Sequence, residues 1–390
     1  MHIIHLNEIG GFFGGAEQYV YRLAKGLAKA GHTSSYLYTN ADGIDPDRFF
    51  EPFIDPIFLP TPEKLKAYLQ QHNFDLIIIH KLDHVLFLES CSRFYPSLKI
   101  VHDVAAVCPR KHKYFHFSGL SCKYPVGWRC YPCGGFLARN REGFLPVKFV
   151  RIGAKFKEIA INKRFNILLA PSEYIRQELI QNAIPSHKTL VIPYGIDAPE
   201  EPPLRLKEPD PPHIMFAGSI LRGKGVDLLL KAAAQLEQPF HLDLIGQGNG
   251  MAKYKALAKK LGLNDQVTFH GWLPQENLKH FYLSSRVVAF SSRAPESFGL
   301  IGIEAMAHCL PIVGFDVGGV STWLKNRING FLIPEGNIDQ FSQRLDELLG
   351  DADFARNLGK KGHNFLLKNF TFDRYMKKFL RLIDDLTHDF

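Results

Sequence analysis

Short apolar segments and longer amphipathic segments alternate along the first half of the chain. Residues 2–6 form an apolar run of strand length, and in residues 14–31 the apolar positions recur with the period of a helix. Similar short runs predict strands at residues 35–39, 76–80, 99–102, 168–171 and 190–193. Regular alternation of strands and helices is typical of parallel sheets in an α/β fold.

The alternation stops at residues 198–212, where six of the fifteen residues are proline and four are acidic. We expect a semi-rigid linker there, because this composition suits neither a helix nor a central strand. After the linker, the pattern predicts strands at 213–218, 242–246, 267–270 and 287–291, and helices at 224–236 and 300–307. An amphipathic pattern from Arg374 onwards predicts one more helix.

These elements predict an α/β protein with two facing Rossmann-like domains, parallel sheets and a cleft between the domains. The N-terminal domain comprises residues 1–197 and the C-terminal domain residues 213–370. The helix in 371–390 is expected to pack back toward the N-terminal domain. Ligands of such sheets bind beyond the carboxyl ends of the strands, which places the candidate site in the cleft.

Composition excludes several classes of protein. The 390 residues are 46% hydrophobic and 22% charged, which is ordinary for a globular chain and excludes intrinsic disorder. No apolar run approaches the roughly 18 residues that a membrane-spanning helix needs. Residues 1–5 have no feature of a signal peptide, and six cysteines do not suggest a secreted disulfide scaffold. We therefore expect a cytoplasmic protein.

The clearest chemical motif is the segment Pro295-Glu296-Ser297-Phe298-Gly299-Leu300, which follows one predicted strand and opens a helix. Free backbone N–H groups at a helix start favour an anion, and Gly299 would let a phosphate approach closely. Glu304, on the helix, could accept hydrogen bonds from a vicinal diol such as ribose. The same spacing also fits a glutamate that stabilises the helix dipole and a second, solvated glutamate.

The motif resembles family 4 of the retaining glycosyltransferases, which have the GT-B fold. Other segments agree with that family in order along the chain. They are Gly14-Gly15-Ala16-Glu17, Pro193-Tyr194-Gly195-Ile196-Asp197, Gly218 through Gly225, Pro311-Ile312-Val313 and Gly318-Gly319. The chain departs from the family pattern at Ser219, where an arginine is usual, and at Tyr194, where an asparagine is usual.

The resemblance implies roles for individual residues. Glu296 would contact hydroxyls of the donor sugar, Lys224 would neutralise the departing diphosphate, and Arg222 would replace the missing arginine. His102 would lie at the reacting centre on the acceptor side. The implied donor-binding residues are Gly14, Gly15, Gly218, Trp272, Phe298, Gly299, Leu300, Ile301 and, for the ribose, Glu304.

The activity implied by the resemblance is retaining transfer of a sugar from a nucleoside diphosphate to a hydroxyl of a glycan or lipid-linked acceptor. A UDP-sugar is the first expected donor, and GDP- and ADP-sugars are alternatives. The transfer needs no metal or other cofactor, and no nucleic acid is expected as a partner. Two alternatives remain open: a nucleotide-sugar epimerase on the same fold, and a non-catalytic adaptor at a membrane surface.

A dinucleotide-binding enzyme is disfavoured. The run Gly246-Gln247-Gly248-Asn249-Gly250 follows a predicted strand, but its spacing is Gly-x-Gly-x-Gly and not Gly-x-Gly-x-x-Gly. Asp265 lies ahead of its strand, whereas a ribose-binding acid belongs at the end of one.

Four cysteines crowd into an inserted region at residues 108–136. Cys130 and Cys133 have the spacing of half a tetrahedral zinc site, and Cys108 and Cys122 could complete it. Reduced thiols without metal are the alternative. A zinc ion held by four protein ligands would be structural, because no coordination position would stay open.

Most of the net charge of +8 is concentrated between Arg139 and Arg164, which contains eight basic and two acidic residues. The pattern predicts a helix over 148–159 with Lys148, Arg151 and Lys155 on its basic side. Such a helix could lie on an anionic membrane surface, so that the protein would be peripheral to the inner face of the membrane. The alternative is a core-facing helix with a solvated basic side.

Overall fold

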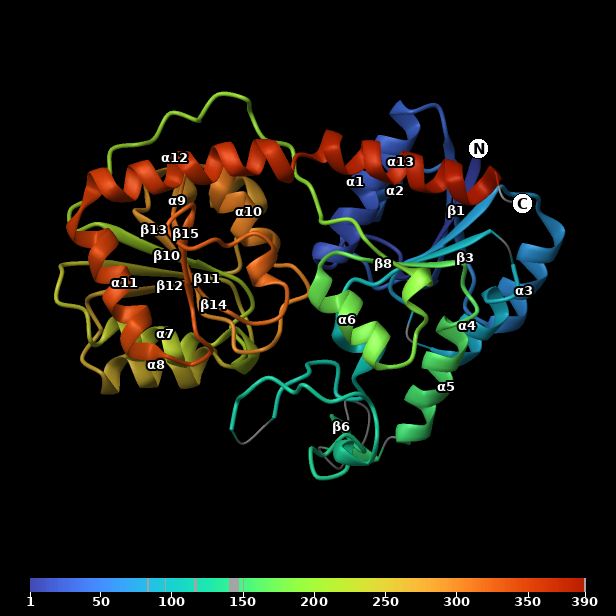
Figure 1. Cartoon of the computed structure of the whole chain (residues 1–390), viewed down its shortest axis with the longest axis horizontal. Helices are drawn as coiled ribbons and strands as arrows, with labels where there is room; N and C mark the ends of the chain where they lie inside the picture. The colour runs from blue at the N-terminus through green and yellow to red at the C-terminus, as the bar shows by residue number, and fades with distance from the viewer. Residues whose placement is uncertain (83, 95, 116–117, 140–146, 150, 389–390) are drawn as a thin grey trace. The chain divides into compact units, whose positions relative to one another are not determined.

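The computed structural model describes residues 1–82, 84–94, 96–115, 118–139, 147–149 and 151–388 (Figure 1). Internal contacts divide the chain into two compact units. Unit 1 contains Met1–Lys113, Lys123–Pro193 and Tyr375–Phe390, and unit 2 contains Tyr114–Cys122 and Tyr194–Arg374. Each unit has its own parallel sheet with helices, which confirms the prediction of two Rossmann-like domains.

A seven-stranded parallel sheet lies at the centre of unit 1 in the part of the chain that the structure describes. Its strand order is β3-β2-β1-β4-β5-β8-β9. Ile77, Ile78 and Ile79 are fully buried, because both faces of a parallel sheet are covered. The strands are β1 (His2–Ile9), β2 (Thr33–Asn40), β3 (Asp55–Phe58), β4 (Leu76–Ile79), β5 (Ser97–Ile100), β8 (Ile167–Ala170) and β9 (Thr189–Val191).

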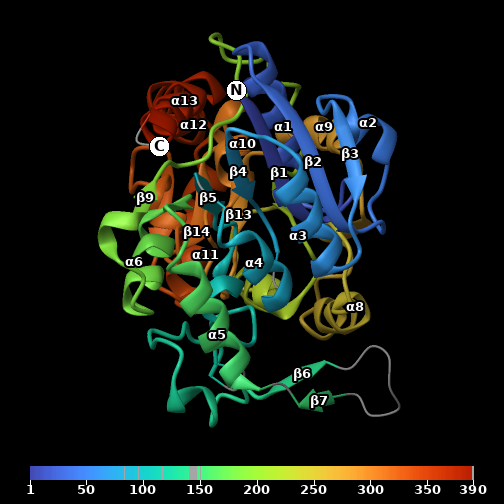
Figure 2. The same cartoon turned by 90° about the vertical axis from the view of Figure 1, so that its right-hand side faces the viewer.

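Helices flank this sheet and connect its strands. The described helices are α1 (Gly15–Lys29), α2 (Pro46–Phe50), α3 (Pro62–Gln71), α4 (Val85–Cys91), α5 (Ile152–Asn162), α6 (Glu173–Gln181), α13 (Phe372–His388) and the short 3₁₀ turns η1 (Val104–Val107), η2 (Trp128–Cys130) and η3 (Ser186–Lys188). A small antiparallel ribbon pairs β6 (Leu137–Arg139) with β7 (Val147–Phe149). Figure 2 shows this ribbon beyond α5, away from the main sheet of unit 1.

The C-terminal helix α13 packs on α1, although almost the whole chain lies between them in sequence (Figure 1). The hydroxyls of Tyr19 and Tyr375 are hydrogen-bonded to each other. A Cβ on Gly26 would lie 2.7 Å from the sulfur of Met376, so the glycine lets the two helices approach closely. This packing is why residues 375–390 group with unit 1.

Unit 2 contains a six-stranded parallel sheet, counted over the described residues, with the order β12-β11-β10-β13-β14-β15. Its strands are β10 (His213–Ala217), β11 (His241–Ile245), β12 (Val267–Gly271), β13 (Val287–Phe290), β14 (Ile312–Phe315) and β15 (Gly330–Ile333). Its helices are α7 (Val226–Ala233), α8 (Met251–Lys260), α9 (Gln275–Ser284), α10 (Leu300–Ala307), α11 (Ile338–Gly350), α12 (Ala352–Asn369) and the short turns η4 (Arg222–Lys224) and η5 (Val320–Thr322). Figure 1 shows α7 and α8 on one face of the sheet and α9, α10 and α12 on the other.

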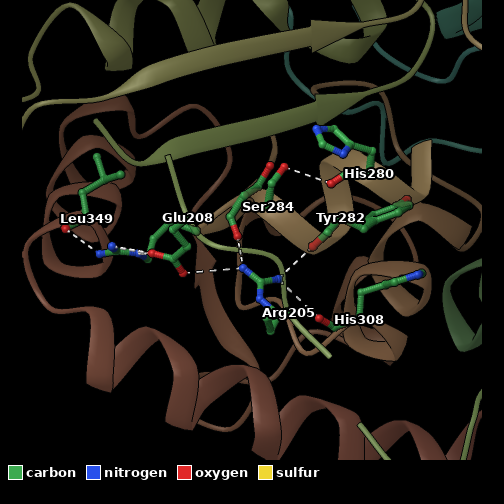
Figure 3. A network of polar contacts seen from close by, with 9 residues as sticks. Arg205, Glu208, His280, Tyr282, Ser284, His308 and Leu349 are labelled. Atoms are coloured by element: carbon green, nitrogen blue, oxygen red, sulfur yellow. Dashed lines mark hydrogen bonds and ion pairs between the residues drawn. The ribbon is translucent and has the colours of Figure 1, made fainter. Parts of the chain in front are cut away.

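The proline-rich segment 198–212, predicted as a linker, contains no helix or strand and groups with unit 2, to which it is fastened (Figure 3). Arg205 donates hydrogen bonds to the carbonyl oxygens of Tyr282, at 2.8 Å, and of Ser285. Glu208 forms an ion pair with Arg286 at 2.5 Å. These contacts hold the segment against the end of α9.

The prediction of a basic helix over residues 148–159 is wrong in two respects. Helix α5 begins at Ile152, and residues 147–149 form strand β7 instead. Lys155 does not face solvent: it is buried, pairs with Glu158 three residues later and donates to the carbonyl of Ala105 at 2.6 Å. The side chain of Lys148 lies outside the described part of the structure. Over the described residues, no helix is both long and apolar enough to cross a membrane.

Candidate active site

The predicted site residues fall into two groups. Gly14, Gly15 and His102 belong to unit 1, and the remaining catalytic and donor-binding candidates belong to unit 2. In each unit they lie in segments that follow the carboxyl ends of strands, where α/β sheets bind ligands. Each group is described by itself.

In unit 2, the loop from β13 to α10 has a conformation that only glycine suits. Gly299 immediately precedes α10 with φ = +92°, and a Cβ there would lie 2.8 Å from the ring of Phe290. The indole N–H of Trp323 donates to the carbonyl of Phe298 at 2.6 Å. The amides of Leu300 and Ile301 stand in the first turn of α10, where a helix supplies no carbonyl partner of its own. The loop therefore presents backbone N–H donors at the carboxyl end of β13.

Glu296 is held by both its side chain and its backbone. One carboxylate oxygen accepts from Nζ of Lys224 and from the hydroxyl of Ser292, each at 2.6 Å. Its carbonyl accepts from the amide of Gly319 at 2.7 Å, and a Cβ on Gly318 would come within 2.3 Å of that carbonyl oxygen. The structure thus brings Glu296 and Lys224 together, and it gives the Gly318-Gly319 pair a physical reason.

The turn η4, which carries Arg222 and Lys224, is fastened along residues 291–294. The carbonyl of Gly223 accepts from the amides of Arg293 and Ala294 at 3.0 and 2.9 Å. Gly225 has φ = +66°, and a Cβ there would lie 1.9 Å from the carbonyl oxygen of Ser291. This left-handed glycine separates the turn from α7, so the helix predicted to start at Lys224 starts at Val226.

Glu304 lies one turn into α10 and accepts a hydrogen bond from the hydroxyl of Tyr282 at 3.0 Å. Trp272 follows β12 and its side chain is 62% exposed, so the indole is open to a ligand. Gly218 follows β10 in the same sheet. A Cβ on Gly246 would lie 1.9 Å from the carbonyl oxygen of Gly218, so the run Gly246-x-Gly248-x-Gly250 serves close backbone packing and not a dinucleotide.

In unit 1, His102 belongs to a hydrogen-bonded row of three histidines: His5 is on β1, His80 directly follows β4, and His102 follows β5. Nδ1 of His5 lies 2.9 Å from Nε2 of His80, and Nδ1 of His80 lies 3.3 Å from Nε2 of His102. Burial lowers the pKa of His5 and of His102 to about 3, and it lowers the pKa of His80 well below its ordinary value. All three rings are therefore neutral at pH 7, and because a neutral imidazole has one donor and one acceptor, their tautomers are coupled.

The glycine loop of unit 1 is organised by a buried glutamate. The carboxylate of Glu17 accepts from the amide of Gly14 at 3.0 Å and from the side-chain amide of Asn7 at 3.4 Å. Glu17 is 2% exposed, whereas Gly14 and Gly15 are exposed. The capping of α1 thus leaves a bare glycine turn open to a ligand.

The predicted zinc site uses four cysteines of the inserted region, Cys108, Cys122, Cys130 and Cys133. Among the described residues, no group of three or more histidine, cysteine, aspartate or glutamate side chains is placed to hold a metal ion. Cys108 and Cys133 lie near Cys130, whose pKa is raised mainly by burial and further by those two thiols. Cys122 belongs to the segment that groups with unit 2. The zinc site has no support from this geometry and stays a prediction.

Two family models match the chain one after the other. Glycosyltransferase Family 4 matches residues 13–200, and Glycosyl transferases group 1 matches residues 197–365, so together they cover both units. The chain belongs to the group 1 glycosyltransferases with the GT-B fold. The resemblance inferred from the sequence motifs is confirmed.

The relatives of this group 1 glycosyltransferase differ in how much of the chain they match. D-inositol 3-phosphate glycosyltransferase of Nocardia farcinica is 35% identical over 161 residues, which are 39% of this chain and 36% of that protein. An uncharacterized glycosyltransferase of Methanocaldococcus jannaschii is 24% identical over 82% of this chain and 88% of its own length. The match to the first of these relatives thus spans about a third of its length.

Solved structures show the same fold over the whole chain. Sucrose-phosphate synthase from Thermosynechococcus elongatus superposes with a TM-score of 0.72 at 21% identity, covering 100% of both chains. Anabaena Alr3699/HepE in complex with UDP-glucose superposes with a TM-score of 0.75 at 18% identity, covering 99% of this chain and 100% of the other. At these identities the likeness establishes the GT-B fold.

Sequence reasoning missed several residues that contact the candidate site residues. Ser292 and Tyr282 bind the two glutamates, and His80 and His5 continue the row from His102. A single serine or tyrosine carries no pattern. The histidines had a signal, because His80 directly follows a buried strand whose neighbour ends at the candidate His102.

Proposed function

We propose that the protein is a retaining glycosyltransferase that moves a sugar from a nucleoside diphosphate to a hydroxyl of a glycan or lipid-linked acceptor. The observation that carries the proposal is the arrangement around Glu296. A carboxylate, the cation of Lys224 and the first turn of α10 meet at the carboxyl edge of the sheet of unit 2. Family membership supports sugar transfer as the use of that arrangement.

The positive charges of the proposed site would stabilise a nucleoside diphosphate as the leaving group. The amides of Leu300 and Ile301 would bind phosphate oxygens, as helix N-termini do. Lys224 and Arg222 carry the positive charge that stabilises the diphosphate as its negative charge grows. Lys224 already contacts Glu296, so one cation would connect the leaving group to the residue that holds the sugar. Glu304 would accept the ribose hydroxyls.

Transfer with retention needs no protein nucleophile in this proposal, because the acceptor hydroxyl attacks the face from which the diphosphate departs. The transfer also requires no metal ion, since Lys224, Arg222 and the helix amides supply the positive charge. His102 is the residue of unit 1 assigned to the reacting centre, with its tautomer tied to His80.

Uridine diphosphate is the first choice of nucleotide. The structure of Anabaena Alr3699/HepE with UDP-glucose supports it, and GDP- and ADP-sugars are the alternatives. Incubation with a panel of these nucleotide-sugars tests the function. Release of free sugar together with the nucleoside diphosphate is expected. Formation of a 2-epimer would identify an epimerase, and no turnover with any donor would identify a non-catalytic adaptor.

A second proposal concerns the lipid-linked acceptor and an anionic membrane at the cytoplasmic side. The inserted region and strand β7 of unit 1 expose large aromatic side chains: Trp128 is 73% exposed, Tyr131 58% and, on β7, Phe149 83%. The guanidinium of Arg129 lies over the rings of Trp128 and Tyr124. Aromatic rings beside cations are typical of the membrane interface. These residues, and not helix α5, form the proposed membrane surface.

Vesicle sedimentation tests the membrane surface. The protein is expected to bind vesicles that contain anionic lipid, and replacing Trp128 and Tyr131 by alanine should release it. Phe58→Ala removes an aromatic side chain that is 48% exposed on β3 and serves as the matched control. Equal binding by the double variant and the control would contradict the proposal.

A further inference from the structure

Tyr282 lies beside the proposed ribose-binding glutamate and has no assigned role. Its hydroxyl donates to Oε2 of Glu304 at 3.0 Å, and its side chain is only 3% exposed. We propose that Tyr282 is a positioning residue for the donor, which fixes the carboxylate of Glu304 in the orientation that the two ribose hydroxyls require. This inference rests on the proposed function, because it assigns the ribose to Glu304.

The ring of Tyr282 has little freedom to move. It stacks on the imidazole of His308, with ring centroids 4.7 Å apart and planes 8° from parallel. Nδ1 of His308 donates to the carbonyl of Glu304 at 2.8 Å, so His308 and Tyr282 hold the backbone and the side chain of the same residue. Burial lowers the pKa of His308, which keeps this ring neutral.

The protonation states fit a fixed donor–acceptor pair. Burial raises the pKa of Tyr282 well above its ordinary value, and the nearby carboxylate of Glu304 raises it further. The phenol therefore keeps its proton and remains a donor at neutral pH. A hydrogen bond to a carboxylate is stronger than one between neutral groups, so it can hold the Glu304 side chain against rotation.

The linker fastens the elements that carry this pair. Figure 3 shows the guanidinium of Arg205 between the carbonyls of Tyr282 and His308, which accept at 2.8 and 3.5 Å. Tyr282 is near the end of α9, and His308 directly follows α10. One side chain of the linker thus contacts the ends of both helices and limits changes in the distance between Tyr282 and Glu304.

The geometry leads to a specific consequence for binding. A carboxylate that accepts two vicinal hydroxyls must present its oxygens in one plane and at one angle. Without the phenol hydroxyl, the carboxylate of Glu304 loses one of the contacts that orient it, and binding of the ribose must then supply more of the ordering. Only ligands with ribose hydroxyls should therefore bind more weakly when the phenol hydroxyl is removed. Ligands that lack them make no contact that depends on the orientation of Glu304.

The test uses Tyr282→Phe in the full chain and isothermal titration with the nucleoside diphosphate that binds the wild type most tightly among UDP, GDP and ADP. Affinity is expected to fall roughly 3- to 10-fold, the range for one ordinary hydrogen bond, because the lost contact orients Glu304 and does not itself touch the ligand. The 2′,3′-dideoxy analogue should bind the variant and the wild type equally. Tyr68→Phe, at a tyrosine of unit 1 whose ring also stacks on a histidine, His72, is the matched control and should behave as wild type.

A double-mutant cycle separates this inference from the proposed function. In a Glu304→Ala background, Tyr282→Phe should have no further effect on affinity. If Glu304→Ala itself leaves affinity unchanged, the proposed ribose role of Glu304 is wrong. If Glu304→Ala weakens binding while Tyr282→Phe does not, the inference is overturned. An equal loss for the nucleotide and its dideoxy analogue would also overturn it, because general damage to the fold acts on both ligands alike.

Discussion

At the scale of single residues, the charged members of the site could be predicted and their neutral partners could not. Glu296, Glu304 and Lys224 occur in a recognisable order along the chain. Their contacts with Ser292 and Tyr282 depend on how strands and helices meet in space. The predicted roles also change in one respect, because Lys224 and Glu296 form one ion pair and do not act as separate groups.

Lys224→Ala should affect turnover far more than binding. The attraction between Lys224 and the diphosphate grows as the bond to the sugar breaks, so we expect turnover to fall roughly 100- to 1,000-fold. Steady-state kinetics and titration with the free nucleotide measure the two effects. Lys231→Ala, at an exposed lysine of α7, is the control. A loss of affinity as large as the loss of turnover would mean that Lys224 only binds the donor.

At the scale of elements, most strands were predicted near their observed positions, because a buried parallel strand is an apolar run in the sequence. The basic helix was not. Lys155 and Glu158 have the spacing of a solvated ion pair on a helix surface, but Lys155 also donates to the carbonyl of Ala105, from another part of the chain, and both residues are buried. Long-range partners of this kind leave no local pattern.

Gly225→Ala tests the turn that holds Lys224. Both Gly225 and Gly262 have positive φ, +66° and +76°, but only at Gly225 would a Cβ collide with the backbone. Gly262→Ala should cost about 1 kcal/mol of unfolding free energy for its backbone conformation alone. Gly225→Ala should cost about 1–3 kcal/mol more and should reduce turnover. Denaturant unfolding of both variants measures this, and equal costs would contradict the packing of η4 on residues 291–294.

At the scale of the whole molecule, the two-domain architecture was predictable, whereas the assignment of one segment was not evident from its place in the sequence. The segment Tyr114–Cys122 groups with unit 2 although both of its neighbouring segments belong to unit 1. Composition and periodicity describe what a segment is. They do not predict which unit a segment contacts when those contacts are a few hydrogen bonds, such as those that Ser121 donates to Glu335.

Unit 1 should lose stability in mild acid. His5 has a pKa of about 3 when folded and 6.5 in its ordinary state. Because the folded value is lowered, the unfolded chain binds more protons between these values, and stability is lost as the pH falls below 6.5. The expected slope is about 1.4 kcal/mol per pH unit from His5 alone, and His80 acts in the same direction.

Hydrogen exchange of the β1 and β4 amides at pH 7 and pH 5 measures this loss. His5→Gln should make the dependence on pH shallower, whatever its effect on stability at pH 7. His187→Gln, at an exposed histidine, should leave the slope as in the wild type. An unchanged slope in His5→Gln would contradict the assignment of neutral, buried imidazoles.

The most direct test of the account is the affinity of the bare nucleoside diphosphate for Glu304→Ala and Glu296→Gln. Glu304 is assigned to the ribose, so Glu304→Ala should weaken binding by roughly 1.5–3 kcal/mol. Glu296 is assigned to the sugar, which the bare nucleotide lacks, so Glu296→Gln should leave affinity nearly unchanged while turnover falls. If Glu296→Gln loses nucleotide affinity and Glu304→Ala keeps it, the donor lies in the opposite direction along α10 and the assignment is wrong.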